Sequence, residues 1–297
     1  MTTPSANARG IVLASVAAVA FGTLAIFAKL GYDDGAGLLP LLAARFLVAV
    51  VLLAAYHIAI RRPLWVGRRD VVRLMLLGGV GYAAESALFF LGLERAPAAV
   101  ISLVFFTYPT WTSLLGFVTR MEPYSHRTVA SLALGSAGIA LIFSLRLESL
   151  AGPLFALLAA MSLAVYLLVA QIVMARVEAS VAATWTATGA LVAFSGATLV
   201  TGSGLPRAAF DEAAALGAAT AVAFVLLYRA IELIGFTRTA VASMLEPVAT
   251  IVLAALLLDE AITGRVVLGA VLVVAALPVL ALAPRGAEPE LPPPAGP

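Results

Sequence analysis

Three ionisable side chains, Arg45, Glu85 and Glu246, lie inside long apolar stretches of this sequence. A charged group inside a membrane is costly, so such residues usually face a polar cavity or a partner of opposite charge. Glu85 has two alternatives: it pairs with Arg45, or it faces a cavity where it binds a cationic group or exchanges a proton. The chemistry that these residues indicate is the recognition of a small polar solute within an apolar protein.

Aromatic and hydroxyl side chains accompany these charges at helical spacing. Phe105, Tyr108 and Thr112 fall on one helical face. Tyr82, Glu85 and Phe89 share a face in the same way. Trp185 is either a cavity wall or an interfacial anchor. The candidate substrate-binding residues are Tyr82, Glu85, Phe89, Phe105, Tyr108, Thr112, Trp185, Ser243 and Glu246, with Pro109 and Pro247 as hinges.

The two prolines each stand within an apolar stretch. A proline has no N–H to donate, so it frees the carbonyl four residues earlier, which belongs to Phe105 for Pro109 and to Ser243 for Pro247. We therefore expect a kink at each proline that exposes backbone polarity near the middle of the membrane. Prolines are common in membrane helices, and the alternative is that the kinks only shape packing.

Both prolines belong to an internal repeat. Glu94, Pro109, Glu122 and Arg127 recur as Glu232, Pro247, Glu260 and Arg265, each 138 positions later. The same shift maps the face of Phe105, Tyr108 and Thr112 onto Ser243, Glu246 and Thr250. The chain is therefore a duplicated unit. We expect one wall of the cavity to be aromatic and the other polar.

The elements that position these residues are apolar runs long enough to cross a membrane. Of 297 residues, 63% are hydrophobic and 11% charged, which excludes a water-soluble fold. We predict an all-α integral membrane protein. Its ten helices fall at 10–30, 38–60, 71–93, 96–119, 127–145, 152–175, 180–201, 212–234, 239–258 and 264–284.

Five helices per repeat is an odd number, so the second copy runs upside down relative to the first. Inverted repeats are the architecture of secondary transporters. The predicted organisation is a short N-terminus at 1–9, a first repeat at 10–146, an inverted second repeat at 151–284 and a disordered tail at 285–297. Twelve arginines fall on the side of both termini, against five basic residues on the other, which predicts two cytoplasmic termini.

Other function classes lack their motifs. There is no cysteine and only two histidines, so we expect no metal site and no cofactor. An intramembrane enzyme is an alternative of another class, but no HExxH or GxSxG motif and no adjacent pair of intramembrane aspartates occurs. Nothing resembles a channel filter. The basic balance reflects cytoplasmic loops, and we expect no nucleic-acid partner.

The chain resembles the drug/metabolite transporter superfamily in its ten-helix, EamA-type branch. The resemblance is carried by Phe21, Gly22, Lys29, Arg45, Phe46, Ala98, Ser102, Pro109 and Glu122 in the first half, and by Tyr228, Ala230, Leu245, Glu246, Pro247, Asp259 and Glu260 in the second. Within that superfamily the chain is most similar to bacterial inner-membrane exporters of aromatic and neutral amino acids. The resemblance implies a largely hydrophobic central cavity and alternating access.

Two transport hypotheses follow. The first is an inner-membrane exporter of small amphipathic metabolites, namely aromatic and other neutral amino acids, acting as a monomer or homodimer in the lipid bilayer. The second is an exporter of cationic or hydrophobic drugs, attracted by Glu85 and Glu246. A phosphorylated substrate is disfavoured because Arg45 is the one basic residue clearly inside a span.

Overall fold

A computed structural model describes residues 4–93, 95, 101, 104–121, 125–142, 150–174, 177–257 and 264–282. Every regular element in these ranges is helical, in agreement with the predicted all-α class. The tail expected to be disordered, 285–297, and three residues of the repeat, Glu94, Glu122 and Glu260, lie outside the described residues.

The first half of the chain contains α1 (Pro4–Asp33), α2 (Leu38–Ala59), α3 (Arg68–Leu76), a π-helix (Leu77–Tyr82), α4 (Ala83–Leu93), α6 (Tyr108–Val118) and α7 (His126–Ile142). The second half contains α8 (Ala151–Met174), α9 (Ala179–Thr201), a 3-10 turn (Arg207–Ala209), α10 (Phe210–Ile234), α11 (Phe236–Ala242), a second 3-10 turn (Ser243–Leu245), α12 (Glu246–Leu257) and α13 (Gly264–Ala281). Apolar side chains cover much of the outer surface, as a lipid environment requires.

Six described segments are long and apolar enough to cross a membrane: Asn7–Asp33, Leu38–Ala59, Arg68–Gly92, Ala151–Met174, Ala179–Thr201 and Arg207–Ile234. They coincide with six of the ten predicted spans. At the other four, the described helices α6, α7, α11, α12 and α13 are shorter. The predicted number of ten spans stays a prediction.

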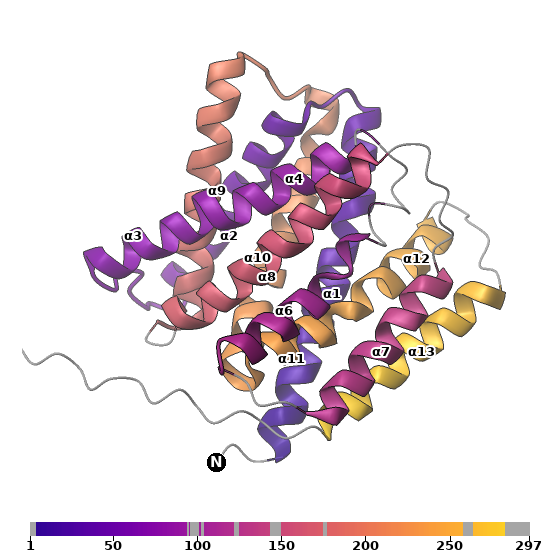
Figure 1. The fold of residues 1–297 in the computed structure, drawn as a ribbon. Helices are drawn as coiled ribbons and strands as arrows, with labels where there is room; N and C mark the ends of the chain where they lie inside the picture. The colour runs from indigo at the N-terminus through magenta and orange to yellow at the C-terminus, as the bar shows by residue number, and fades with distance from the viewer. Residues whose placement is uncertain are drawn as a thin grey trace, which may run out of the picture.

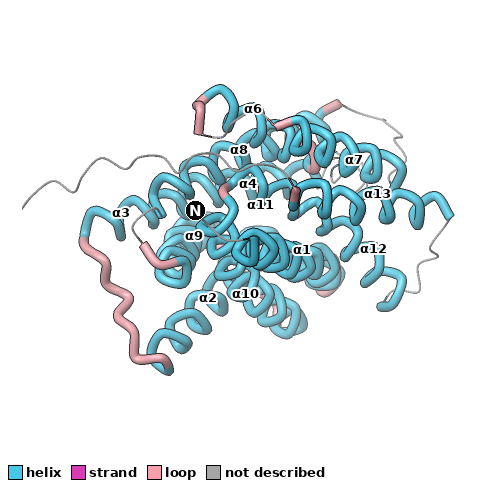
Figure 2. Tube along the Cα trace, turned by 90° about the horizontal axis from the view of Figure 1, so that it is seen from below, coloured by secondary structure: helices cyan, strands magenta, loops and turns pink. Residues whose placement is uncertain are grey.

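Helices from the two halves of the chain pack against each other throughout the molecule (Figure 1). α1 packs along α10, α2 along α9, α4 along α8, and α7 along α13. Figure 2 shows α1 end-on, with helices of the second half around it. The main hydrophobic core accordingly draws on both halves. A site at the interface between the halves therefore lies in the middle of the protein.

Small residues allow several of these helices to approach closely. A Cβ added to Gly78, in the π-helix, would collide with the backbone of Thr186 on α9. A Cβ on Gly189 would collide with the backbone of Met75 in the same way. At the α7–α13 pair, Gly138 lies against Gly269. Gly138 and Gly269 therefore let α7 and α13 pack closely within the protein.

Candidate functional site

The two repeat-related prolines stand where helices begin again after a break. Before Pro109 the backbone turns at 106–107, and α6 starts at Tyr108. Before Pro247 a 3-10 turn separates α11 from α12, which starts at Glu246. The expected kink inside a continuous helix was therefore wrong, because each helix is interrupted just before its proline. Proline is well tolerated in the first turn of a helix, because the N–H it lacks has no partner there.

The two breaks are equivalent in the repeat, since the first residues of α6 and α12 are 138 positions apart. The first residues of α7 and α13, His126 and Gly264, are separated by the same number. Tyr108 and Glu246 thus occupy matching positions at the start of their helices. The hydroxyl of Tyr108 donates to the carbonyl oxygen of Ala240 on α11 at 3.4 Å, so the two broken regions touch.

Helix α1 closes one side of the second break. A Cβ on Gly22 would lie 3.0 Å from the carbonyl oxygen of Glu246 and 3.0 Å from Oγ1 of Thr250. The Thr250 hydroxyl donates to the carbonyl oxygen of Gly22 at 3.1 Å. A side chain at this crossing would require the neighbouring atoms to shift by a few tenths of an ångström. Gly22 therefore brings the backbone of α1 directly against the start of α12.

Arg45 on α2 is the buried cation of the site. Its Nε donates to Oγ1 of Thr220 at 2.6 Å, and its Nη2 donates to the hydroxyl of Tyr82 at 3.1 Å. The guanidinium also lies 5.0 Å from the ring centroid of Phe46. Tyr82 and Thr220 are 138 positions apart, which makes them equivalent residues of the two repeats. Arg45 therefore bridges the two halves.

The carboxyl group of Glu85 is also buried, and it accepts a hydrogen bond from Oγ of Ser86 at 3.1 Å. Between the described side chains of Glu85 and Arg45 there is no ion pair, so the direct pairing considered from the sequence is not formed. Half-buried Glu246 lies close enough for its charge to interact with those of both Glu85 and Arg45. Its charge also reaches the hydroxyls of Tyr82 and Tyr108. Two carboxyl groups and one guanidinium thus share one region.

Aromatic rings surround these charges in two groups. In the first, Tyr82 packs edge-on against Phe224, with ring centroids 4.9 Å apart, and against Tyr166 at 5.5 Å. The hydroxyls of Tyr166 and Tyr228 are hydrogen bonded to each other. In the second group, Phe105 lies 4.7 Å from Phe89 and 5.5 Å from Tyr108. The sequence patterns did not mark Tyr166 or Phe224, because on α8 and α10 they read as ordinary core residues.

The remaining candidates fall in different surroundings. Thr112 is fully buried and donates to the carbonyl oxygen of Tyr108 at 2.7 Å. Ser243 is buried, and its hydroxyl lies near that of Tyr108. Trp185 does not join either aromatic group; its Nε1 donates to the carbonyl oxygen of Leu64, in the α2–α3 connection, at 2.8 Å. Trp185 thus holds a connection in place.

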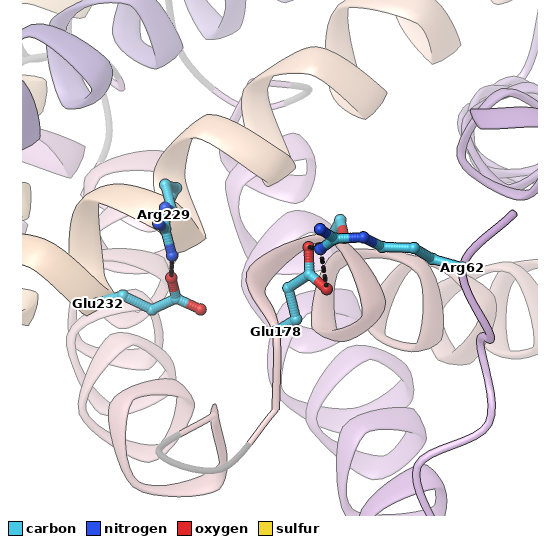
Figure 3. Close-up of polar contacts among 5 residues, drawn as sticks. Arg62, Glu178, Arg229 and Glu232 are labelled. Carbon is cyan, nitrogen blue, oxygen red and sulfur yellow. Dashed lines mark hydrogen bonds and ion pairs between the residues drawn. The ribbon is translucent and has the colours of Figure 1, made fainter. Parts of the chain in front are cut away.

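The same end of the molecule carries ion pairs (Figure 3). Arg62, after α2, pairs with Glu178, directly before α9, at 3.0 Å. On α10, Arg229 pairs with Glu232 at 2.5 Å. The first contact joins the two halves of the chain, and both of its side chains are largely exposed. Exposed pairs of this kind contribute about 0–1 kcal/mol, so this contact can open at little cost.

A hollow of about 370 Å³ lies between α2 and α9, away from the charged residues. It is lined by Pro40, Ala43, Ala44, Leu47, Leu191, Ser195, Thr198, Ser203 and Leu205. None of the predicted binding residues belongs to this lining. In the described state the predicted residues are packed against one another.

Comparison with known proteins agrees with this architecture. The model of the EamA-like transporter family matches the chain twice, over residues 8–144 and 150–282, and the chain belongs to that family. The chain is 28% identical over 278 residues to the uncharacterized transporter YcbK of Bacillus subtilis (strain 168), covering 85% of this chain and 86% of that protein.

A crystal structure whose description states no function is similar with a TM-score of 0.78. The match covers 92% of this chain and 98% of the other, at 21% identity, and therefore concerns the fold alone. With the family established, the protein is a membrane transporter of the drug/metabolite transporter superfamily.

Proposed function

We propose that this transporter exports small amphipathic metabolites, aromatic and other neutral amino acids, across a bacterial inner membrane. The observation that carries the proposal is the shared region of Arg45, Glu85 and Glu246 between two groups of aromatic rings. An amino acid of this class has both charges and an apolar side chain. A site with both signs of charge beside aromatic surface matches all three parts.

Alternating access is the transport mode that the repeat supports best. Helices are interrupted at equivalent positions before Tyr108 and before Glu246, and interrupted helices of this kind form the substrate sites of inverted-repeat transporters. The halves contact each other along several helix pairs, and rocking of one half against the other would open the packed centre to one side at a time. The exposed Arg62–Glu178 pair would hold one end closed between steps.

Reconstitution into proteoliposomes tests the substrate class. Four labelled compounds would be offered: phenylalanine, alanine, a nucleoside and a quaternary ammonium drug. Each set of vesicles is preloaded with the unlabelled form of the compound that it is offered, and protein-free vesicles give the background. We expect counterflow of the amino acids above background, strongest for phenylalanine. Counterflow of the quaternary ammonium drug alone would instead support the second candidate, a cation exporter, which the two carboxyl groups Glu85 and Glu246 favour.

A further inference from the structure

Arg45 is a buried cation that no described carboxylate neutralises. Arg45 is 3% exposed, and its contacts with described side chains are two hydroxyls and two aromatic rings, those of Phe46 and Tyr82. The hydroxyls of Thr220 and Tyr82 fix the guanidinium in place but carry no negative charge. Burying a charge without an opposite partner is unfavourable. A purely structural role at this position would be filled at lower cost by an apolar side chain.

The negative groups that could neutralise Arg45 are close but held apart. Glu85 and Glu246 interact electrostatically with Arg45, yet neither forms an ion pair with it in the described structure. The hydroxyl of Tyr82 accepts a hydrogen bond from Arg45, and the ring of Tyr82 packs on Phe224. Arg45 and the two carboxyl groups thus stand in one region without a direct contact between them.

Arg45 contacts both halves of the chain but has no basic counterpart in the second half. Its two hydrogen-bond acceptors, Tyr82 and Thr220, are equivalent residues of the two halves. The residue equivalent to Arg45 itself, 138 positions later, is Ala183. The cation is therefore single and lies where the two halves meet. If the halves move relative to each other, the surroundings of Arg45 change, because it contacts Tyr82 in one half and Thr220 in the other.

We propose that Arg45 binds the carboxylate of the transported amino acid, while Glu85 and Glu246 form the end of the site that faces its ammonium group. Guanidinium groups recognise carboxylates through two parallel hydrogen bonds, and Nε and Nη2 are the donor atoms now engaged by hydroxyls. The substrate carboxylate replaces the hydroxyls of Thr220 and Tyr82 as acceptor when the halves separate. This assignment rests on the proposed amino-acid export.

Three probes that share a phenyl ring test the assignment: phenylalanine, phenethylamine without the carboxylate, and 3-phenylpropionate without the ammonium group. Each is offered to the full-length protein in proteoliposomes. The wild-type protein should transport phenylalanine at least about tenfold faster than either analogue, because each analogue leaves one charged group of the site unpaired. Equal transport of all three compounds would overturn the proposal without any variant.

Arg45→Gln should lower the ratio of phenylalanine to phenethylamine transport by at least about tenfold. Arg45→Lys, which keeps the charge but loses the planar fork, should restore part of that ratio. Glu246→Gln and Glu85→Gln should lower the ratio of phenylalanine to 3-phenylpropionate instead. The matched control is Arg238→Gln, because Arg238 is equally buried but donates to the carbonyl oxygen of Leu280 at the end of α13.

Arg238→Gln should change the transport of all probes by a common factor and leave both ratios unchanged. Phenylalanine transport with an unaltered ratio in Arg45→Gln would refute the role of Arg45 while leaving amino-acid export intact. If the wild-type protein transported no amino acid at all, the proposed function itself would fail. The two failures are therefore distinguished by the wild-type measurement.

Discussion

Tyr108 and Glu246 begin two helices at equivalent positions, and each adds a different chemistry to the same region of the protein. The preceding turns carry Phe105 in one half and Ser243 in the other. A phenol and a phenyl ring therefore stand opposite a carboxyl group and a hydroxyl. The two matched breaks therefore carry unlike side chains.

Replacing Ser243 or Tyr108 by tryptophan tests whether this region binds substrate. Both side chains are buried, so the larger ring fills space that the substrate would need, and transport should fall by more than about tenfold. Counterflow of phenylalanine is the measurement, with insertion checked by size-exclusion chromatography. Val192→Trp is the control, because Val192 is 58% exposed and can carry a larger side chain. Normal transport by both variants would place the site elsewhere.

The sequence could mark candidate residues for a site but not the partners that each of them contacts. Pro109 and Pro247 could be located because proline chemistry and the repeat both mark them. The contact of Arg45 with Thr220 joins residues 175 positions apart, and no local periodicity contains that information. For Trp185 the sequence offered a cavity wall or an interfacial anchor, and its bond to the Leu64 carbonyl could not be foreseen from either alternative. Contacts that depend on how helices are placed cannot be inferred from helical faces alone.

At the scale of elements, the third predicted span is one long helical segment with a π-helix in its middle, Leu77–Tyr82. The π-helix contains Gly78, Gly79 and Gly81, and its last residue is Tyr82, one of the candidate binding residues. Short π-helical segments interrupt the regular hydrogen bonding of a helix and often lie at functional sites. Gly78 and Gly79 permit the contact with α9, and we expect the π-helix held by this contact to orient Tyr82. The sequence predicted the span but not the π-helix, because hydropathy does not report which backbone hydrogen bonds a helix forms.

The close approach of α3 to α9 predicts a sharp difference between two glycines on α9. Gly189→Ala should destabilise the protein by about 1–3 kcal/mol, because the new Cβ would collide with the backbone of Met75. Gly196→Ala should be neutral or stabilising by up to about 1 kcal/mol, because nothing lies within 4 Å of its Cβ and alanine favours a helix. Thermal unfolding of the two purified variants in detergent provides the comparison.

An unchanged melting temperature in Gly189→Ala would show that α3 and α9 can separate without cost. In that case the contact would not hold the π-helix, and its role in orienting Tyr82 would have to be abandoned. Loss of stability in both variants would point instead to a general effect of substitution on α9.

At the scale of the whole molecule, the protein consists of two related halves, because the family model matches the chain twice. Helices of one half pack against helices of the other. The duplication could be read from the constant shift of 138 positions. The interleaving could not, because it depends on which helix of one half packs on which helix of the other. The odd number of spans expected per half predicts that equivalent loops face opposite sides of the membrane.

Trp65 and Ser203 test this inversion, because they are 138 positions apart and both are exposed, in the α2–α3 and α9–α10 connections. The chain has no cysteine, so a single cysteine at either position is the sole thiol. A membrane-impermeant maleimide should label Ser203→Cys in intact cells and Trp65→Cys only after permeabilisation, since the excess of arginines predicts that the termini and the Trp65 loop are cytoplasmic. Labelling of both positions from outside would contradict the inverted repeat. The reverse pattern would agree with the inversion but place both termini outside the cytoplasm.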